Sequence, residues 1–325
     1  MTNERRKFIR TGLAGIAGLS TLPLLGSLAG CQQRPARDTA GQSAKAKVAP
    51  VRVLPISKVT DRINVVTDAP GNVVVLNTGS GLLLVDAGSV DLAPSVQKTL
   101  AGAAVGTLFN THYHADQTGG NALFATAGAE IHAQTITKQW LAADYYVPAE
   151  DRWVKAPPKE AVPAVTFRGK GEMKAGAETI EYGYLQEAHT RGDAYIFFRD
   201  SNVLAAGDVV SPLRDPVLDW YAGAWLGARA DAVDDLVKIA NEQTLIVPAY
   251  GKVLNYTELK AERDLMAKLY DLTSALYHKG HSAEDIMAKG VLNDVGRTFK
   301  DPYKFLYDAV KGYQAHYTNF GGNVV

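Results

Sequence analysis

Hydrophobic positions between residues 60 and 90 come in short runs that are rich in β-branched side chains and end at turn residues. The runs are residues 63–66, 73–76 and 82–85, and the last is followed directly by Asp86-Ala87-Gly88. Short runs of this kind, bounded by Gly, Asn or Asp, are typical of β-strands. The folded part of the chain is therefore predicted to begin with three strands.

Farther along, runs with strand character alternate with runs that have helical spacing. Apolar positions recur every three to four residues in a helix, whereas a buried strand is a short continuous apolar run. The predicted elements are a helix over 91–100 with Pro94 in its first turn, a strand over 107–109, a helix over 121–127, strands over 130–132, 179–185, 194–198 and 203–206, a helix over 230–241 and a strand over 245–247. This alternation predicts an α/β fold.

After residue 255 the pattern changes to amphipathic helices, and no further strand is expected. Two later helices are predicted over 282–289 and 302–316, with no linker-like segment between them. We therefore expect a catalytic domain over 51–255 and a C-terminal helical elaboration over 256–325 that packs on it. The leucines expected near one face of the first of these helices are Leu259, Leu265, Leu269, Leu272 and Leu276.

The first fifty residues have the composition of an export signal and a tether. A basic head, Arg5-Arg6-Lys7-Phe8-Ile9-Arg10, precedes an uncharged apolar run over 11–30, which is the layout of a bacterial export signal. The paired arginines resemble the twin-arginine signal, whose cargo crosses the membrane folded, and Leu28-Ala29-Gly30-Cys31 resembles the lipobox of bacterial lipoproteins. We therefore predict a signal over 1–31, a lipid anchor at Cys31 and a flexible tether over 32–50.

A second interpretation of the same segment stays open. Twenty apolar residues can just span a bilayer, so residues 11–30 are also compatible with a plain N-terminal membrane anchor. Both interpretations place the body of the protein on the periplasmic side of the envelope. Cleavage before Cys31 would remove four basic residues and one acidic residue from the 34 of each, which leaves 30 against 33 and a net charge of −3.

Charge and cysteine content narrow the partners and the metal ligands. The balance of 34 basic and 34 acidic residues in 325 provides no uniform field for nucleic acid, so a small-molecule substrate is expected. Cys31 is the only cysteine, so no intramolecular disulfide can form and no thiolate is available to a metal in the folded body. A metal site would need histidine, carboxylate or other oxygen ligands. Composition leaves the oligomeric state open.

Several potential ligands follow predicted strands. His112 and His114 come directly after the strand at 107–109, two positions apart, and on extended backbone such residues point the same way. Asp116, two positions further on, can join them. Zinc takes about four N, O or S ligands and usually gathers some of them from distant loops. Candidates for the remainder are His189, after the strand at 179–185, and Asp208, after the strand at 203–206.

These motifs, in this order, resemble the metallo-β-lactamase superfamily from about residue 55 to about residue 255. Asp86 with Gly88 resembles the first motif, residues 112–116 with Gly119-Gly120 the second, His189 the third and Asp208 the fourth. The resemblance implies a four-layer αβ/βα sandwich with metals at one edge, between the two sheets. Asp86 is expected to order the loop under the site rather than to ligate metal.

The resemblance also implies which residues hold metal. The first ion would be bound by His112, His114 and His189, with Asp208 bridging to a second ion that Asp116 also contacts. The chain departs from the family pattern at Gln117 and at Tyr250, where many members have histidine. A neutral amide and a protonated phenol are poor substitutes for imidazole. Our hypothesis is one tightly bound zinc and a weak or absent second ion; an oxygen-rich second site would favour manganese or iron.

The function that follows is hydrolysis. Zinc bound by three imidazoles lowers the pKa of its water to about 7, so a metal-bound hydroxide could attack an ester, lactone, amide or related bond. Asp116 is expected to act as general base or proton shuttle. Tyr250 either donates a hydrogen bond to an oxyanion or packs as an aromatic in a degraded site. Ser211 stands where zinc lactamases often carry a substrate-binding lysine, which disfavours β-lactam hydrolysis.

Two other classes of function stay open. Persulfide dioxygenases of the superfamily hold one iron with two histidines and an aspartate, a set that His112, His189 and Asp208 could imitate. A non-catalytic ligand-binding lipoprotein with a degenerate metal site is the third possibility. The substrate cannot be named from the sequence, because loop shape and a few contacts determine it.

Overall fold

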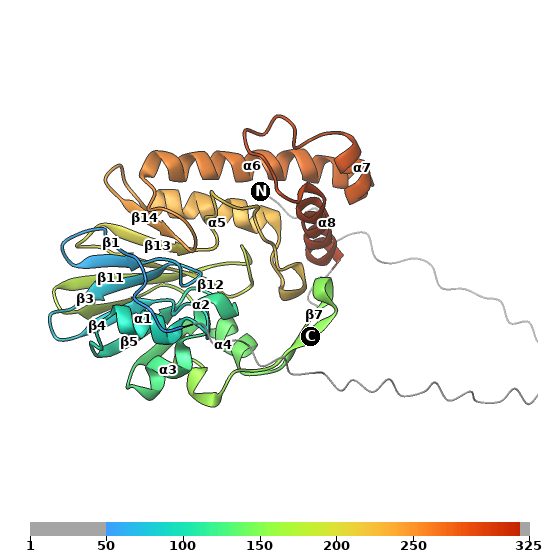
Figure 1. Ribbon diagram of the computed structural model, residues 1–325. Helices are drawn as coiled ribbons and strands as arrows, with labels where there is room; N and C mark the ends of the chain where they lie inside the picture. Colours follow the sequence, from blue (N-terminus) through green and yellow to red (C-terminus); the bar gives the residue numbers. More distant parts are fainter. Residues whose placement is uncertain (1–49, 319–325) are drawn as a thin grey trace, which may run out of the picture. The chain divides into compact units, whose positions relative to one another are not determined.

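Two β-sheets form the centre of the computed structural model, which describes residues 50–318 (Figure 1). The predicted signal with Cys31, the predicted site of a lipid anchor, and all but the last residue of the predicted tether lie outside the described residues. The first sheet contains, in order across it, β1 (Ile56–Lys58), β2 (Ile63–Val66), β3 (Val73–Asn77), β4 (Leu82–Val85), β5 (Val105–Asn110), β6 (Glu130–Gln134) and β9 (Val165–Phe167). Strands β1 to β4 pair antiparallel, and β4, β5, β6 and β9 pair parallel.

The second sheet is antiparallel except at one edge, where β13 and β14 are parallel. Its order is β10 (Gly171–Ala175), β11 (Glu178–Leu185), β12 (Asp193–Phe198), β13 (Val203–Gly207) and β14 (Leu245–Pro248). A separate hairpin pairs β7 (Tyr145–Val147) with β8 (Arg152–Val154).

The helices are α1 (Ala93–Thr99), α2 (Ala115–Thr118), α3 (Asn121–Thr126), α4 (Thr135–Leu141), α5 (Leu226–Ile239), α6 (Tyr256–Tyr277), α7 (Ala283–Ala288) and α8 (Pro302–Thr318). Short 3₁₀ turns cover Pro148–Glu150, Lys159–Ala161 and Trp220–Ala222. Within residues 50–318, no helix is both long enough and apolar enough to cross a lipid bilayer.

Three apolar clusters divide the structure into layers. The central cluster lies between the sheets, where side chains such as Ile63 and Leu76 of the first sheet meet Ile196 and Phe198 of the second. A second cluster joins the other face of the first sheet to α1 and α3, and a third joins the other face of the second sheet to α5 and the C-terminal helices. Helix, sheet, sheet and helix therefore follow one another, which is the four-layer αβ/βα sandwich expected from the sequence.

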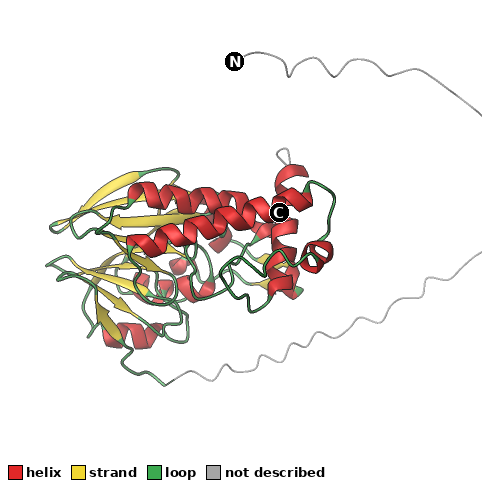
Figure 2. Cartoon of the chain, turned by 90° about the horizontal axis from the view of Figure 1, so that it is seen from above, coloured by secondary structure: helices red, strands yellow, loops and turns green. Residues whose placement is uncertain are grey.

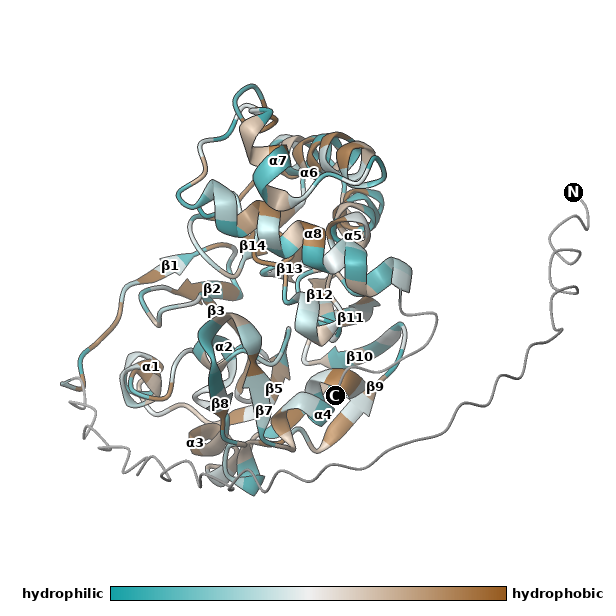
Figure 3. Cartoon of the chain, turned by 90° about the vertical axis from the view of Figure 1, so that its right-hand side faces the viewer, coloured by the Kyte–Doolittle hydropathy of each residue, from teal (hydrophilic) through white to brown (hydrophobic). Residues whose placement is uncertain are grey.

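The C-terminal helices share the third cluster with the second sheet. Helices α5 and α6 lie alongside each other over the strands (Figure 2), and the helices α5 to α8 gather on the side of β13 and β14 (Figure 3). Helix α6 begins at a capping box, in which Asn255 and Glu258 bond each other's backbone N–H groups. Buried Tyr313 of α8 lies within hydrogen-bond distance, 2.7 Å, of Thr273 in α6. The helices are thus packed on the sandwich by apolar and polar contacts.

One face assignment in α6 was wrong. Leu272 was expected on the buried face but is exposed, whereas Thr273 beside it is fully buried. Thr273 is tolerated there because its hydroxyl donates to the Leu269 carbonyl and contacts Tyr313. Leu259 and Leu269 are buried as expected.

Candidate metal centre

The ligand candidates lie at the ends of strands from both sheets. Strand β5 ends at Asn110, and the chain then passes through His112 to His114, which caps α2. His189 lies in the loop between β11 and β12, and Asp208 follows the last residue of β13. The two sheets are tied together here, because the backbone N–H of Ala194 donates to the carbonyl of Thr111 over 2.8 Å. The strand ends therefore form one edge at which residues far apart in sequence meet.

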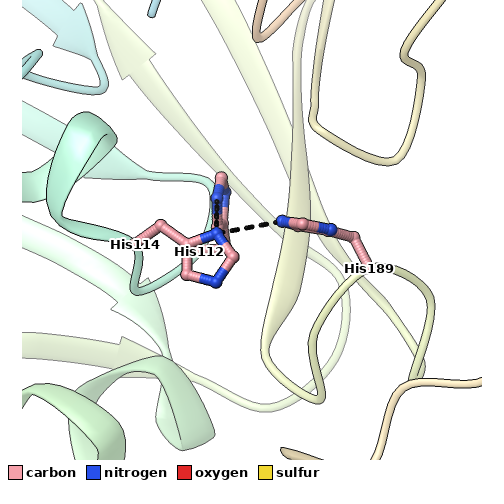
Figure 4. Close-up of side chains that lie close together, drawn as sticks. All are labelled: His112, His114 and His189. Carbon is pink, nitrogen blue, oxygen red and sulfur yellow. Dashed lines mark hydrogen bonds between the residues drawn. The ribbon is translucent and has the colours of Figure 1, made fainter. Parts of the chain in front are cut away.

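His112, His114 and His189 converge at this edge (Figure 4). His114 Nδ1 lies 3.2 Å from His112 Nε2 and 3.1 Å from His189 Nε2. Each pair of ring centroids is 4.8 Å apart, and the rings are nearly perpendicular. Three ring nitrogens directed at one point form a set that can hold a metal ion.

The second nitrogen of each ring is bonded away from the cluster. His189 Nδ1 donates to the carbonyl of Val217 over 3.0 Å, and His114 Nε2 donates to Asp219 over 2.6 Å. His112 Nδ1 lies 3.0 Å from the hydroxyl of Thr111, which in turn donates to Asp86. Because the outward nitrogens carry the protons, the inward nitrogens present lone pairs to one another. That arrangement is repulsive without a cation between them, so the residues fit a metal.

Burial acts on the protonation of these rings. Burial lowers the pKa values of His112 and His189 well below the ordinary histidine value, and neighbouring histidines lower them further. Both rings are therefore neutral at pH 7, which is the form that binds metal. Burial also lowers the pKa of His114, but the Asp219 carboxylate raises it more, and the net direction is upward. Burial raises the pKa of Asp219, but His114 and the Tyr113 and Tyr221 hydroxyls lower it below its usual value, so this group is ionised.

Asp208 lies beside the imidazole cluster and faces two groups. Its Oδ2 atom is 3.3 Å from His189 Nε2 and also forms an ion pair with Arg214. Its Oδ1 atom is buried and has no hydrogen-bond partner among the described residues. A buried carboxylate oxygen without a partner is costly, so this atom also fits a nearby cation.

The other predicted site residues lie outside the imidazole cluster. Asp116, in α2, is partly exposed, and within residues 50–318 its side chain makes no hydrogen bond or ion pair. Gln117 is fully buried, and neither atom of its amide has a hydrogen-bond partner in the described part of the chain. Tyr250 lies after β14, with the guanidinium of Arg214 3.7 Å from its ring centroid. The structure thus brings three of the predicted ligands together, with Asp208 adjacent.

Residues of the first motif, Asp86 to Gly88, and of the second motif, Gly119-Gly120, pack beneath the loop that carries His112 and His114. Asp86 accepts hydrogen bonds of 2.8 Å from both the backbone N–H and the hydroxyl of Thr111, so it orients the residue before His112. A Cβ on Gly119 would lie 2.2 Å from the backbone N of Val90, and one on Gly120 2.5 Å from the carbonyl of Ala87. Glycine is required at both positions because the second-motif turn packs directly on the first-motif loop.

Three residues that position the predicted ligands were not predicted from the sequence. Asp219, in an aromatic run, bonds His114. Arg214 pairs with Asp208. Buried Arg229 donates to the carbonyls of Asp208 and Val217, and so links the loops that carry Asp208 and support His189. No motif spacing points to these residues, and burial of a charged side chain such as Arg229 is visible only in the fold.

Aromatic residues around the second motif and around Trp225 form two separate groups. Trp140, Tyr145 and Tyr221 pack around Tyr113, whose hydroxyl donates to Asp219 over 2.5 Å. Trp225 instead stacks on His316 of α8, far along the sequence. The first group therefore supports the carboxylate that bonds His114, and the second fastens the C-terminal helices.

The fold and site together define an α/β sandwich protein with a three-imidazole cluster at the edge between its sheets. Residues 66–248 match the family model described as "Metallo-beta-lactamase superfamily". This match covers more than half of the chain, and the chain belongs to that superfamily.

Individual relatives are distant. The chain is 25% identical over 189 residues to proteins named "Metallo-beta-lactamase type 2" from Bacillus sp. (strain 170) and from Bacillus cereus, which covers 57% of this chain and 68% of each relative. A metallo-beta-lactamase structure from Pontibacter korlensis aligns with a TM-score of 0.53 at 18% identity, over 66% of this chain and 99% of that one. The inverting sec-alkylsulfatase Pisa1 from Pseudomonas sp. aligns with a TM-score of 0.61 at 15% identity, over 83% of this chain and 51% of that one. The chain thus matches about half the length of the alkylsulfatase, and these structures show the shared fold.

Proposed function

We propose that this protein is a metal-dependent hydrolase of the cell envelope, with one tightly held zinc at His112, His114 and His189. The observation that carries the proposal is the convergence of three ring nitrogens whose opposite nitrogens are all bonded outward. A set of three imidazole ligands favours zinc among the common ions. The bond cleaved is an ester, lactone, amide or related bond.

A zinc ion held there would supply Lewis-acid chemistry, namely activation of water for attack on a polar bond. The protein's own residues divide the remaining tasks. His112 and His189 are buried and close the site from behind, whereas 22% of the His114 side chain is exposed, so substrate approaches from that side. Asp116 follows His114 by two residues and is free to accept a proton. Tyr250 is the candidate hydrogen-bond donor to a developing oxyanion.

The alternatives differ in their use of Asp208 and His114. An iron dioxygenase site would use Asp208 with His112 and His189 and would leave His114 out. Here His114 Nδ1 lies 3.2 Å from His112 Nε2 and 3.1 Å from His189 Nε2, and Asp208 is paired with Arg214. This geometry favours the three-imidazole set. Ser211 also disfavours a site that binds a substrate carboxylate as in zinc lactamases, because its side chain is buried and accepts a hydrogen bond of 2.7 Å from Arg229.

Elemental analysis joined to a substrate panel tests the proposal. The exported protein is purified without added metal and assayed on carboxylic esters, lactones, amides, a β-lactam, phosphodiesters and a secondary alkyl sulfate ester. We expect one equivalent of zinc per chain and hydrolysis of at least one class. His189→Ala should lose both, because it removes a ligand. His132→Ala is the matched control, since this histidine bonds Glu130 outside the cluster.

Other results would contradict the metal site, the hydrolytic reaction or the catalytic role. A wild-type chain that binds no metal, or a His189→Ala variant as active as the wild type, refutes the metal site. Bound iron with oxygen consumption would replace hydrolysis by oxidation. Bound metal without turnover of any substrate would favour the ligand-binding lipoprotein.

We propose export by the twin-arginine route and a lipid anchor at Cys31 on the periplasmic side. The support is the sequence of residues 5–10 and 28–31. A pathway that carries folded cargo suits an enzyme that acquires its metal before it crosses the membrane.

A further inference from the structure

Arg214 lies among the residues that the family pattern assigns to a second metal ion. Its guanidinium forms an ion pair with Asp208 Oδ2 and lies 3.7 Å from the centroid of the Tyr250 ring. Two of the four positions expected around a second ion, Asp208 and Tyr250, thus contact one arginine side chain.

We propose that the Arg214 guanidinium occupies the place of the second metal ion and keeps the centre mononuclear. The proposal rests on the proposed function, because it presumes one ion at His112, His114 and His189. Arg214 acts as a positioning residue. It holds the Asp208 carboxylate beside His189, as a second cation would.

Charge is the first reason that a second ion is excluded. The guanidinium of Arg214 carries a positive charge at neutral pH, as arginine does in proteins generally. A divalent ion brought between Asp208 and Tyr250 would meet this fixed positive charge at close range, where water screens it poorly. One oxygen of Asp208, Oδ2, is also already engaged with the guanidinium.

The second reason is the stacking on Tyr250. A guanidinium over an aromatic face gains a cation–π attraction, and its planar shape suits the ring. Imidazole at position 250 would offer a ligand instead. Tyr250 and Arg214 therefore act as a pair, and the tyrosine at this position and the arginine beside it have one explanation.

Gln117 fits the same picture. Its buried amide has no hydrogen-bond partner among the described residues, and because an amide is neutral it leaves the charge of Arg214 unchanged. Removing the guanidinium would leave the Asp208 carboxylate without its cation, and the neighbouring second-motif residues Asp116 and Gln117 carry further oxygen atoms. These are oxygen ligands of the kind that divalent ions accept.

Metal titration of matched variants tests the proposal. Metal-free wild type, Arg214→Ala, Arg214→Lys and Arg199→Ala are titrated with zinc and with cobalt(II), and bound ions are counted by native mass spectrometry. Arg199 is a surface residue paired with Glu172 and serves as the remote control. We expect one ion in the wild type, Arg214→Lys and Arg199→Ala, and two in Arg214→Ala. The cobalt absorption spectrum of Arg214→Ala should gain a component from the second ion.

Thermal unfolding gives an independent readout. Arg214→Ala leaves a buried carboxylate unpaired, so its melting temperature should fall and should recover as zinc rises beyond one equivalent. The wild type should show no rise beyond its first equivalent. If the alanine variant does not fold, Arg214→Gln replaces it, with the same expectation.

The outcomes separate the two proposals. A wild type that binds no ion refutes the proposed function. One bound ion in both the wild type and the neutral variants refutes the proposed role of Arg214 and leaves the proposed function standing. Two bound ions in the wild type have the same consequence. The wild-type count is decisive even where no neutral variant folds, because saturation at one ion supports the proposal and a second ion overturns it.

Discussion

At the scale of single residues, Asp219 is the carboxylate on which the orientation of His114 depends. It accepts from His114 over 2.6 Å and from Tyr113 over 2.5 Å, and it is buried. Carboxylates that orient a metal-bound histidine typically contribute 10- to 100-fold to metal affinity. We expect Asp219→Asn to weaken zinc binding by about that factor, measured by competition with a chromophoric chelator.

The control for this substitution is Asp144→Asn, which makes the same chemical change on the surface, where Asp144 pairs with Lys155. Its zinc affinity should equal that of the wild type. Equal affinity of the Asp219→Asn protein would show instead that His114 is oriented by its place at the start of α2 alone.

The imidazole cluster is the part of the site that the sequence predicts best. On extended backbone, the side chains of residues two positions apart, such as His112 and His114, point the same way. This geometry is local, so the sequence alone predicts it. The partners of their outward nitrogens are harder to predict. Asp219, which bonds His114, lies 105 residues later in the sequence, and its position depends on the path of the loop after β13. The same holds for Arg214, whose contact with Tyr250 joins two loops. Loop paths of this kind have no periodicity from which they can be predicted.

At the scale of elements, the end of β13 depends on a glycine. Gly207 has a φ of +56°, and a Cβ there would lie 2.9 Å from the Cβ of Thr111, the residue that bonds His112. A left-handed conformation costs a non-glycine residue about 1–2 kcal/mol, and overpacking adds about 1–3 kcal/mol. We expect Gly207→Ala to lower the free energy of unfolding by the sum of both, measured by urea denaturation.

Gly102 provides the matched control. Its φ is +72°, but a Cβ there would meet nothing within 4 Å. Gly102→Ala should therefore show only the cost of about 1–2 kcal/mol for the left-handed conformation. If the two variants lose the same stability, Thr111 moves aside freely and the contact at the end of β13 is unimportant.

Elements with strong periodicity were predicted more completely than short ones. Strands β11 to β13 and helices α5 and α8 were predicted to within a few residues at each end, and a helix was predicted to begin after residue 255, where α6 begins. The short strands β1, β7 to β10 and the helices α2 and α4 were not predicted. They are three to seven residues long, and such lengths give no repeated pattern because tertiary contacts rather than local sequence define them.

At the scale of the whole molecule, the sandwich and the C-terminal helices share one apolar cluster. Leu204 and Ile246 of the second sheet belong to the same cluster as Leu259, Phe305 and Tyr313 of the helices. The edge that carries the imidazole cluster is connected to these helices through Arg229 of α5, whose guanidinium donates to the backbone carbonyl of Asp208. Folding of the helices and formation of the metal centre are thus linked, and a folded cargo would carry both together.

Export of the molecule is the last prediction, and two substitutions test it separately. Replacing Arg5 and Arg6 by lysine should leave the protein in the cytoplasm, because the twin-arginine route requires the arginine pair. Cys31→Ser should leave an exported protein that is no longer membrane-bound by a lipid, since burial of acyl CH₂ groups at about 0.8 kcal/mol each drives such anchoring. Fractionation of cells and mass spectrometry of the N-terminus provide the measurements. Continued export of the lysine pair would point to the general secretory route. Retention of Cys31→Ser in the membrane fraction would show instead that the apolar run over 11–30 is itself the anchor.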